Sequence, residues 1–526
     1  MPVSPTYPGV YIEEIPSGVR TITGVATSIT AFIGRALRGP SNEPTTINSF
    51  ADFERLFGGL DSNYPMSYAV QDFYTNGGSQ AIIVRLFKSA ADGKSKNAAT
   101  GLTLEAPYPG TSYDGTTIVV DNAGIDADVA KAQGLTIADL FNLTIQYKPP
   151  NGPIEKIRNV SVKEGPRRVD RALAQASRFL RVHTKADGTP DPALPGHPPV
   201  NTVDPNNPPK LSGGADSDAL AAAADFIGDE NTKTGIYALK KTDLFNLLCI
   251  PPDTRNGSID PAVYQKAVKL CVDRRAFMIV DSPAAWGANP DTAVSAAVAG
   301  LPTLGLSGDT ARNAAIYFPR VIEGDPMRND QLDTFVPCGL IAGIMARTDT
   351  QRGVWKAPAG LDAALNGIQG LDVNLNDDEN GTLNQLGINC LRSFGIAGRV
   401  VWGARTLRGA DQLADEYKYV PVRRLALFIE ESLFRGTKWV VFEPNDEPLW
   451  AQIRLNVGAF MHNLFRQGAF QGQTPKDAYF VKCDKETTTQ NDINLGIVNI
   501  IVGFAPLKPA EFVIIKIQQI AGQIAA

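Results

Sequence analysis

The chain has 526 residues, which is too long for a single hydrophobic core, so we expect about two to four domains. Hydrophobic residues make up 43% and charged residues 20%, the proportions of an ordinary globular protein. The formal net charge of −5 lacks the basic surplus of a general nucleic-acid binder, so direct contact with nucleic acid is not expected.

The first 22 residues form an arm that is interrupted by proline and glycine. In an extended chain Val10 and Ile12 lie on one side and Tyr11 on the other, with Tyr7 at the start of the same strand-like segment. The opening sequence MPVSPTYPGV has neither the basic part nor the apolar part of a signal peptide, so we expect synthesis in the cytoplasm without one.

The following segment, 23–89, alternates strands and helices. Residues 23–34 are rich in β-branched residues and predict a strand, and 80–87 predict another. Between them Ser49 is a suitable N-cap for a short helix that ends at a pair of glycines.

From 90 to 235 the sequence changes character. Eight prolines fall between residues 186 and 214, together with many Asp, Asn and Gly residues, so neither a helix nor a central strand is expected there. This block therefore predicts an inserted domain with long exposed loops. Alternation of strand and helix returns over 236–400, with strands at 244–250 and 276–280 and a helix that begins at Asp260. The predicted fold class is mixed α/β, in several domains.

The segment 401–505 predicts a further domain built on two amphipathic helices, with strands at 438–443 and 477–484. Asp446 is the expected N-cap of the second helix. The apolar positions of the two helices are Leu425, Phe428, Ile429 and Leu433, then Leu449, Ile453, Val457, Phe460, Met461 and Leu464.

Residues 506–526 predict a second arm, at the other end of the chain. Its strand, 511–518, is almost continuously apolar, so both of its faces should be buried. The apolar positions are Phe512, Val513, Ile514, Ile515 and Ile517. Two strand-like arms at the two ends of a chain indicate a subunit that is completed by its neighbours.

Motifs for chemistry are incomplete. The glycine spacing that begins at Gly34 resembles a phosphate-binding loop, but Pro40 stands where that loop needs lysine. Three histidines are far apart, and five cysteines are dispersed, which favours free thiols. The longest apolar runs are too short to cross a bilayer, so no membrane insertion is expected. We therefore expect no catalytic residues, no metal site and no cofactor, with a nucleotide-binding α/β enzyme as the weaker alternative.

Several segments resemble the tail sheath proteins of contractile phage tails and related injection systems. They include YPGVYIEEIPSG at Tyr7, TSITAFIGRALRGP at Thr27, LFNLLCIPPD at Leu244, ARTDTQRGVWKAPAG at Ala346 and LKPAEFVIIKI at Leu507. The resemblance covers roughly residues 7–88 and 236–520. It implies a shared sheath core with α/β domains, two terminal exchange strands, and a variable insertion, 90–235, that faces outward.

The resemblance also implies a function and partners. Such proteins polymerise helically around an inner tube and contract to drive that tube through a target envelope, without a cofactor. The expected partners are further copies of the chain, the inner tube protein, and baseplate and terminal cap proteins, within a phage tail or a tail-like particle. In that setting 401–505 faces the tube, and Arg454 and Arg466 are candidate contacts with an acidic tube surface. A non-contractile paralogue that acts as a cap or adaptor is the alternative.

Overall fold

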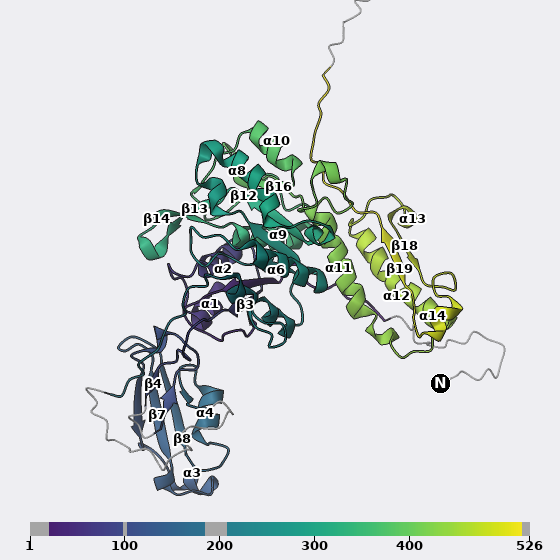
Figure 1. The fold of residues 1–526 in the computed structure, drawn as a ribbon. Coiled ribbons are helices and arrows are strands. Elements are labelled where there is room, and N and C mark those ends of the chain that lie inside the picture. The colour runs from purple at the N-terminus through teal and green to yellow at the C-terminus, as the bar shows by residue number, and fades with distance from the viewer. Residues whose placement is uncertain (1–19, 98–101, 185–207, 518–526) are drawn as a thin grey trace, which may run out of the picture.

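The computed structural model describes residues 20–97, 102–184 and 208–517. These residues form a central body, an inserted domain that projects from one end of the body, and a C-terminal region at its other side (Figure 1). The C-terminal chain leaves the molecule as an extended arm. The predicted mixed α/β class is confirmed.

An eight-stranded sheet forms the centre of the body. In spatial order its strands are β17 (Gly398–Val401), β16 (Ile388–Phe394), β12 (Ala314–Phe318), β11 (Phe277–Asp281), β10 (Leu247–Cys249), β1 (Thr30–Gly34), β3 (Ala81–Arg85) and β2 (Thr45–Ile47). The six inner strands are parallel, and only β2 and β17, at the edges, run antiparallel to their neighbours. All five residues of β1 are buried, as expected for a parallel strand that is covered on both faces.

Helices cover both faces of this sheet. One face carries α1 (Phe50–Phe57), α2 (Met66–Thr75) and α9 (Cys338–Arg352), and the other carries α5 (Ala223–Ile227), α6 (Pro261–Asp273), α7 (Ala284–Gly287), α8 (Ala293–Gly300) and α10 (Asp377–Gln385). The predicted cap Ser49 is confirmed, because its side chain accepts from the N–H of Asp52. The helix expected at Asp260 also begins there, and the Asp260 side chain caps it by accepting from the N–H of Ala262. A small sheet of β13 (Val321–Asp325), β14 (Gln331–Phe335) and β15 (Gly370–Leu371) lies beside the body.

The strand expected over 23–34 begins only at Thr30. The preceding residues instead run along the C-terminal region, where the N–H of Arg20 donates to Asn456 and the N–H of Val25 donates to Ser432. The first described residues are therefore packed against the C-terminal region.

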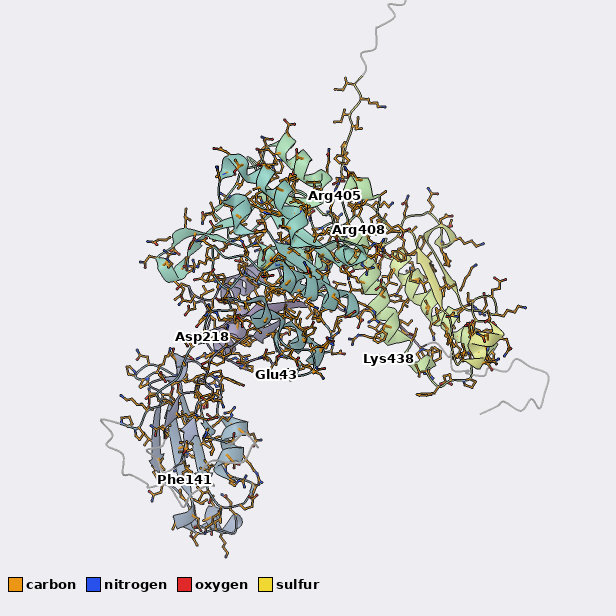
Figure 2. The ribbon with its side chains drawn as sticks, in the orientation of Figure 1. Glu43, Phe141, Asp218, Arg405, Arg408 and Lys438 are labelled. Atoms are coloured by element: carbon orange, nitrogen blue, oxygen red, sulfur yellow. The ribbon has the colours of Figure 1, made fainter. Side chains whose placement is uncertain are left out.

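The inserted domain has a core of its own, in which Phe141 is central (Figure 2). It contains two three-stranded sheets, β4 (Lys96–Asn97) with β5 (Leu104–Glu105) and β9 (Arg181–Val182), and β6 (Thr117–Asp121) with β7 (Phe141–Gln146) and β8 (Ile154–Val160), together with α3 (Ala127–Ala132) and α4 (Val169–Ala176). Although α5 belongs to the 90–235 block, it packs on the main sheet. The separately folded part is thus shorter than that block.

Arg85 joins the inserted domain to the body. Its buried guanidinium donates to the carbonyl oxygens of Ala36 at 2.9 Å, Gly39 at 2.7 Å and Pro109 at 3.0 Å. Ala36 and Gly39 belong to the body and Pro109 to the insert. One side chain therefore fixes two backbone segments from different domains. Nearby, the N–H of Asp218, labelled in Figure 2, donates to the carbonyl oxygen of Lys88.

The C-terminal region is built on α11 (Val420–Gly436) and α12 (Glu447–Arg466). The remaining elements are α13 (Pro475–Ala478), β18 (Tyr479–Lys482), α14 (Gln490–Asn494) and β19 (Ile501–Phe504). The six apolar positions predicted for α12 are all buried, and Asp446 caps that helix as expected. Within the described residues, no helix combines the length and apolar character needed to cross a membrane.

The prediction of a strand over 438–443 is wrong. Lys438–Val440 form a single 3₁₀ turn that continues from α11, and the loop that follows exposes Val441 and Phe442. Trp439 and Val440 pack on the helical core, so the burial of these two side chains favours the turn over an extended strand. The run of β-branched and aromatic residues indicated strand propensity, which packing overrides here.

Candidate assembly site: the C-terminal arm and an open-edged sheet

The C-terminal arm leaves the molecule beside the end of α12. A single bridge pairs Pro506 with Phe470, and the chain then runs extended through Leu507 to Glu511. Beyond Glu511 it lies away from the body (Figure 1), and no described strand pairs with it. Its five apolar side chains are between 71% and 92% exposed, namely Phe512, Val513, Ile514, Ile515 and Ile517. Within one chain this strand is therefore not buried, and its burial in an assembly stays a prediction.

Glu511 fastens the base of the arm to the body. Its carboxylate accepts hydrogen bonds from Nε and Nη2 of Arg405, at 2.6 and 2.7 Å, from the amide of Asn384 at 2.9 Å and from the Tyr419 hydroxyl at 3.0 Å. Burial alone would raise the pKa of Glu511, but the hydrogen bonds from Arg405 and Asn384 outweigh it and hold that pKa below its usual range. The arm thus starts from a fixed, ionised anchor.

Arg405 is held in turn by the body. Its side chain is completely buried, and its Nη1 donates to the carbonyl oxygens of Asn384 and Gly409 and to the carboxylate of Asp411. In Figure 2 Arg405 lies at the base of the arm. A buried arginine with every donor group engaged is a rigid support, because any movement would leave a buried donor without its partner.

A two-stranded sheet, β18 with β19, lies in the same region. The strands pair antiparallel from Tyr479–Phe504 to Lys482–Ile501, and within the described residues neither has a further ladder partner. Two strands alone are marginally stable in water, and each presents an edge of unpaired backbone groups. Phe480 and Ile501 are about half exposed on its outer face. This sheet can accept further strands at its edges.

A cavity of about 970 Å³ adjoins the arm. Its walls come from the chain after α9, from α10, from the segment after β17, from the end of α12 and from the arm itself; they include Arg352, Trp355, Lys356, Trp402, Gln467 and Lys508. A cavity of this size at the junction of two parts of a protein is a usual place for a ligand to bind.

The structure does not bring the remaining expected contact residues together with the arm. Tyr7, Val10, Tyr11 and Ile12 lie outside the described residues. Arg454 is bound within its own region, to the carbonyl oxygen of Cys483 and, at 2.6 Å, to Glu447.

Arg466, the other expected contact, is exposed at the end of α12, and no carboxylate in the described chain pairs with it. Of the two arginines it is therefore the one with a free charge.

The crevice that an α/β enzyme would use is filled. In open parallel sheets, ligands bind at the carboxyl ends of the strands where the strand order reverses, which here is between β1 and β10. Arg35 follows β1 and binds Asp253, which follows β10, through two hydrogen bonds of 2.5 and 2.8 Å. Asp253 also accepts from the N–H of Leu220. The side chains of the protein itself thus occupy this position.

No set of three or more His, Cys, Asp or Glu side chains in the described chain is arranged to hold a metal ion. The five cysteines are buried and unpaired. The residues that sequence reasoning missed are Arg405 and its partner Glu511. Glu511 could have been noticed as the one charge between Pro509 and the apolar strand, but its partner is 106 residues away.

Two family models match the chain. The phage tail sheath protein central domain matches residues 227–407, and the phage tail sheath C-terminal domain matches residues 414–520. The tail sheath protein of Vibrio phage KVP40 is 32% identical over 138 residues, which are 26% of this chain and 20% of that protein. The chain thus spans about a fifth of the length of this curated relative.

Solved structures with the same fold cover nearly the whole chain. A chain from the baseplate of the anti-feeding prophage has a TM-score of 0.55 at 22% identity, over 98% of this chain and 99% of that one. A chain from the contracted sheath complex of the PVC extracellular contractile injection system has a TM-score of 0.57 at 21% identity, over 98% of each. Because the two family models together span more than half of the residues and this fold extends over nearly all of them, the chain belongs to the phage tail sheath family.

Proposed function

We propose that this protein is the main subunit of a contractile sheath, which polymerises helically around an inner tube and contracts to drive that tube through a target envelope. The observation that carries the proposal is an apolar strand that is exposed in the single chain and fixed at its base by Glu511. A strand of this kind is a liability in a monomer and an advantage in a polymer.

The arm of one copy adds to the edge of the β18–β19 sheet of a neighbour. Main-chain hydrogen bonds contribute about 0.5–1.5 kcal/mol each, and the apolar side chains on the two faces of the strand set the register. The donor strand and the acceptor sheet lie at different places on the same molecule. Such a heterologous contact does not close on itself in pairs, and repeated around an axis it gives a ring or a helix.

Contraction is then a change in how whole subunits dock, with no hydrolysis step. Rigid-body rotation of subunits is a common way to release energy that is stored in an assembly. The clamp at Glu511 keeps the base of the arm attached to its own subunit during such a rotation, so neighbouring subunits stay connected. No cofactor takes part in this mechanism.

The partners follow from this arrangement. Copies of the chain contact one another, the C-terminal region faces the inner tube with Arg466 as a candidate contact, and the ends of the polymer meet baseplate and cap proteins. The particle is a phage tail or a headless injection system. Nucleic acid and membrane are not direct partners of the sheath subunit.

Electron microscopy of the purified full chain, alone and with its tube protein, tests the proposal. Long striated tubes that occur in two diameters are the expected result. A folded chain that stays monomeric at high concentration, with intact termini, overturns it.

An adaptor is the second candidate, because one matching chain comes from a baseplate structure. An adaptor forms single rings or short stacks and not long tubes, so the same micrographs distinguish the two. An enzyme is disfavoured by the Arg35–Asp253 pair, which fills the crevice at the strand-order reversal.

A further inference from the structure

A bulky aromatic residue projects from the loop between α11 and α12. Phe442 is fully exposed, and its backbone has a φ of 71°, in the left-handed region that aromatic residues rarely adopt. Val441 beside it is also exposed. An exposed apolar side chain on an unfavourable backbone is typical of a site that is kept for contact with a partner.

The loop that carries Phe442 is held firmly. Asn445 donates to the carbonyl oxygen of Ile497 at 2.9 Å and accepts from the indole N–H of Trp450 at 2.9 Å. The N–H of Glu443 donates to the carbonyl oxygen of Val440. Little conformational freedom is then lost when this loop binds, which favours affinity.

The cavity beside the arm matches the loop in chemistry. Trp355 and Trp402 provide aromatic surface in its walls. Its carboxylates are already engaged, Asp377 by Arg392 and Glu511 by Arg405.

The cations of the cavity are not engaged in this way. Arg352, Lys356 and Lys508 form no ion pair with any described carboxylate, so the cavity carries unpaired positive charge. Burial, and then repulsion from Arg352, lower the pKa of Lys356, and the weaker attraction of Asp362 does not offset them. Glu443, next to Phe442, is exposed and has no cationic partner in the described chain.

The loop and the cavity lie at opposite ends of the same pair of helices. The loop joins the end of α11 to the start of α12, whereas Tyr419, just before α11, and Gln467, just after α12, line the cavity. Figure 2 shows this separation through Lys438, at the loop end, and Arg405, at the arm end. With 20 residues, α12 is about 30 Å long. A subunit therefore cannot fill its own cavity with its own loop.

We propose that Phe442 of one copy inserts into the cavity beside the arm of a second copy, with Glu443 placed against the cations Arg352, Lys356 and Lys508. The contact is heterologous and leaves one free loop and one free cavity after each addition, so it supports continuous assembly. This inference rests on the proposed self-assembly and adds to strand exchange a second junction, which uses the base of the arm and not its apolar strand.

Disulfide trapping tests the geometry. The five native cysteines are buried, so the reactive thiols are those introduced by Phe442→Cys and Lys508→Cys in one chain. Oxidation of the assembled double variant should give a ladder of covalent multimers on a denaturing gel, because a disulfide needs Cα atoms within about 7 Å. The control is Phe442→Cys with Ile137→Cys, since Ile137 is exposed in the inserted domain; it should give no ladder.

Charge reversal gives a second readout, which does not depend on oxidation. Glu443→Lys should raise the critical concentration for assembly about tenfold, which corresponds to about 1.4 kcal/mol. Adding Lys508→Glu to that variant should restore assembly, whereas adding Lys131→Glu, on α3, should not.

The outcomes separate this inference from the proposed function. Tubes that form normally without a ladder, and without an effect of Glu443→Lys, overturn the contact through Phe442 and leave the sheath proposal standing. Dimers without higher multimers show an isologous contact and overturn it as well. Absence of any polymer from the unmodified chain overturns both proposals.

Discussion

The ring of Phe480 lies across the backbone of Gly503, its partner on the opposite strand of the β18–β19 sheet. A Cβ atom at position 503 would stand 2.2 Å from that ring, closer than any real contact allows. The aromatic ring thus covers a glycine that has no side chain of its own. This pair lies on the outer face of the sheet that we propose as the acceptor of a neighbour's arm.

Gly503→Val should disrupt this pair. We expect a loss of about 1–3 kcal/mol in the free energy of unfolding of the C-terminal region, since the ring or the strand must move. Chemical denaturation measures the change, and assembly should weaken with it. Gly458→Ala is the matched control, because no atom lies near its Cβ position within helix α12; it should leave stability equal or higher by up to about 1 kcal/mol. Equal stability of Gly503→Val and the unmodified chain would contradict the packing described here.

Two truncations separate the arm from its anchor. A chain that ends at Glu511 keeps the clamp to Arg405, so it should melt like the full chain and yet fail to polymerise. A chain that ends at Ala510 should also fail to polymerise. Because its buried Arg405 has lost its main partner, its free energy of unfolding should in addition fall by about 1–3 kcal/mol. Melting curves measure the stability of each truncated chain, and micrographs show whether it polymerises. Ile514→Pro, which removes a backbone donor of the arm, should behave like the first truncation. Normal tubes from the chain that ends at Glu511 would exclude exchange of this strand between subunits.

Much of the fold could be predicted from local sequence, and the assembly site only in part. Ser49, Asp260 and Asp446 each cap a helix. Such caps follow from local sequence because the side-chain oxygen accepts from an N–H only two or three residues further along the chain. The Arg405–Glu511 clamp joins positions that are 106 residues apart, and no periodicity signals it. The strand predicted at 438–443 is absent for a related reason. Packing of Trp439 and Val440 against helices that are distant in sequence favours a turn in this segment.

A buried pair of carboxyl groups predicts a pH dependence of stability. Asp72 on α2 and Glu323 on β13 contact each other, and each has a buried oxygen without a donor, so the pair needs a proton. Burial raises the pKa of Glu323 to about 7, above its ordinary 4.5. The folded state therefore binds this proton more tightly, and the free energy of unfolding should fall by about 1–3 kcal/mol as pH rises from 4.5 through 7.

Burial also raises the pKa of Asp72 well above its ordinary value, so the double variant Asp72→Asn with Glu323→Gln should remove most of that dependence, because neither amide ionises. Denaturation midpoints at pH 5 and at pH 8 measure the difference. Glu54→Gln, at an exposed site on α1, is the control and should keep the slope of the unmodified chain. An unchanged slope in the double variant would mean that the pair is not the group that titrates.

The contact with the inner tube can be tested with a substitution at Arg466 alone. Arg454 stabilises its own region through Glu447 and Cys483, so reversing its charge would disturb folding. Arg466→Glu changes an exposed charge and should leave the melting temperature unchanged while tubes separate from sheaths. Lys131→Glu in the inserted domain is the matched control. If micrographs show that sheaths of Arg466→Glu remain filled with tube, Arg466 is not a contact with the tube.

The inserted domain should be partly dispensable for the lattice, and the structure sets the limits of the deletion. Lys210 and Ser212 pair with Thr117 and Lys96, so replacing the whole of 186–214 would strip the edges of both small sheets. Replacing only 186–206 with a short Gly/Ser linker leaves those pairs intact, and it should give a chain with unchanged stability that still forms tubes. The wider replacement should lower the melting temperature of the insert, because backbone hydrogen bonds at two sheet edges are lost. Calorimetry and micrographs of both variants provide the comparison. If the narrow replacement folds normally but no longer assembles, residues 186–206 contact neighbouring subunits and the outward position of this block is wrong.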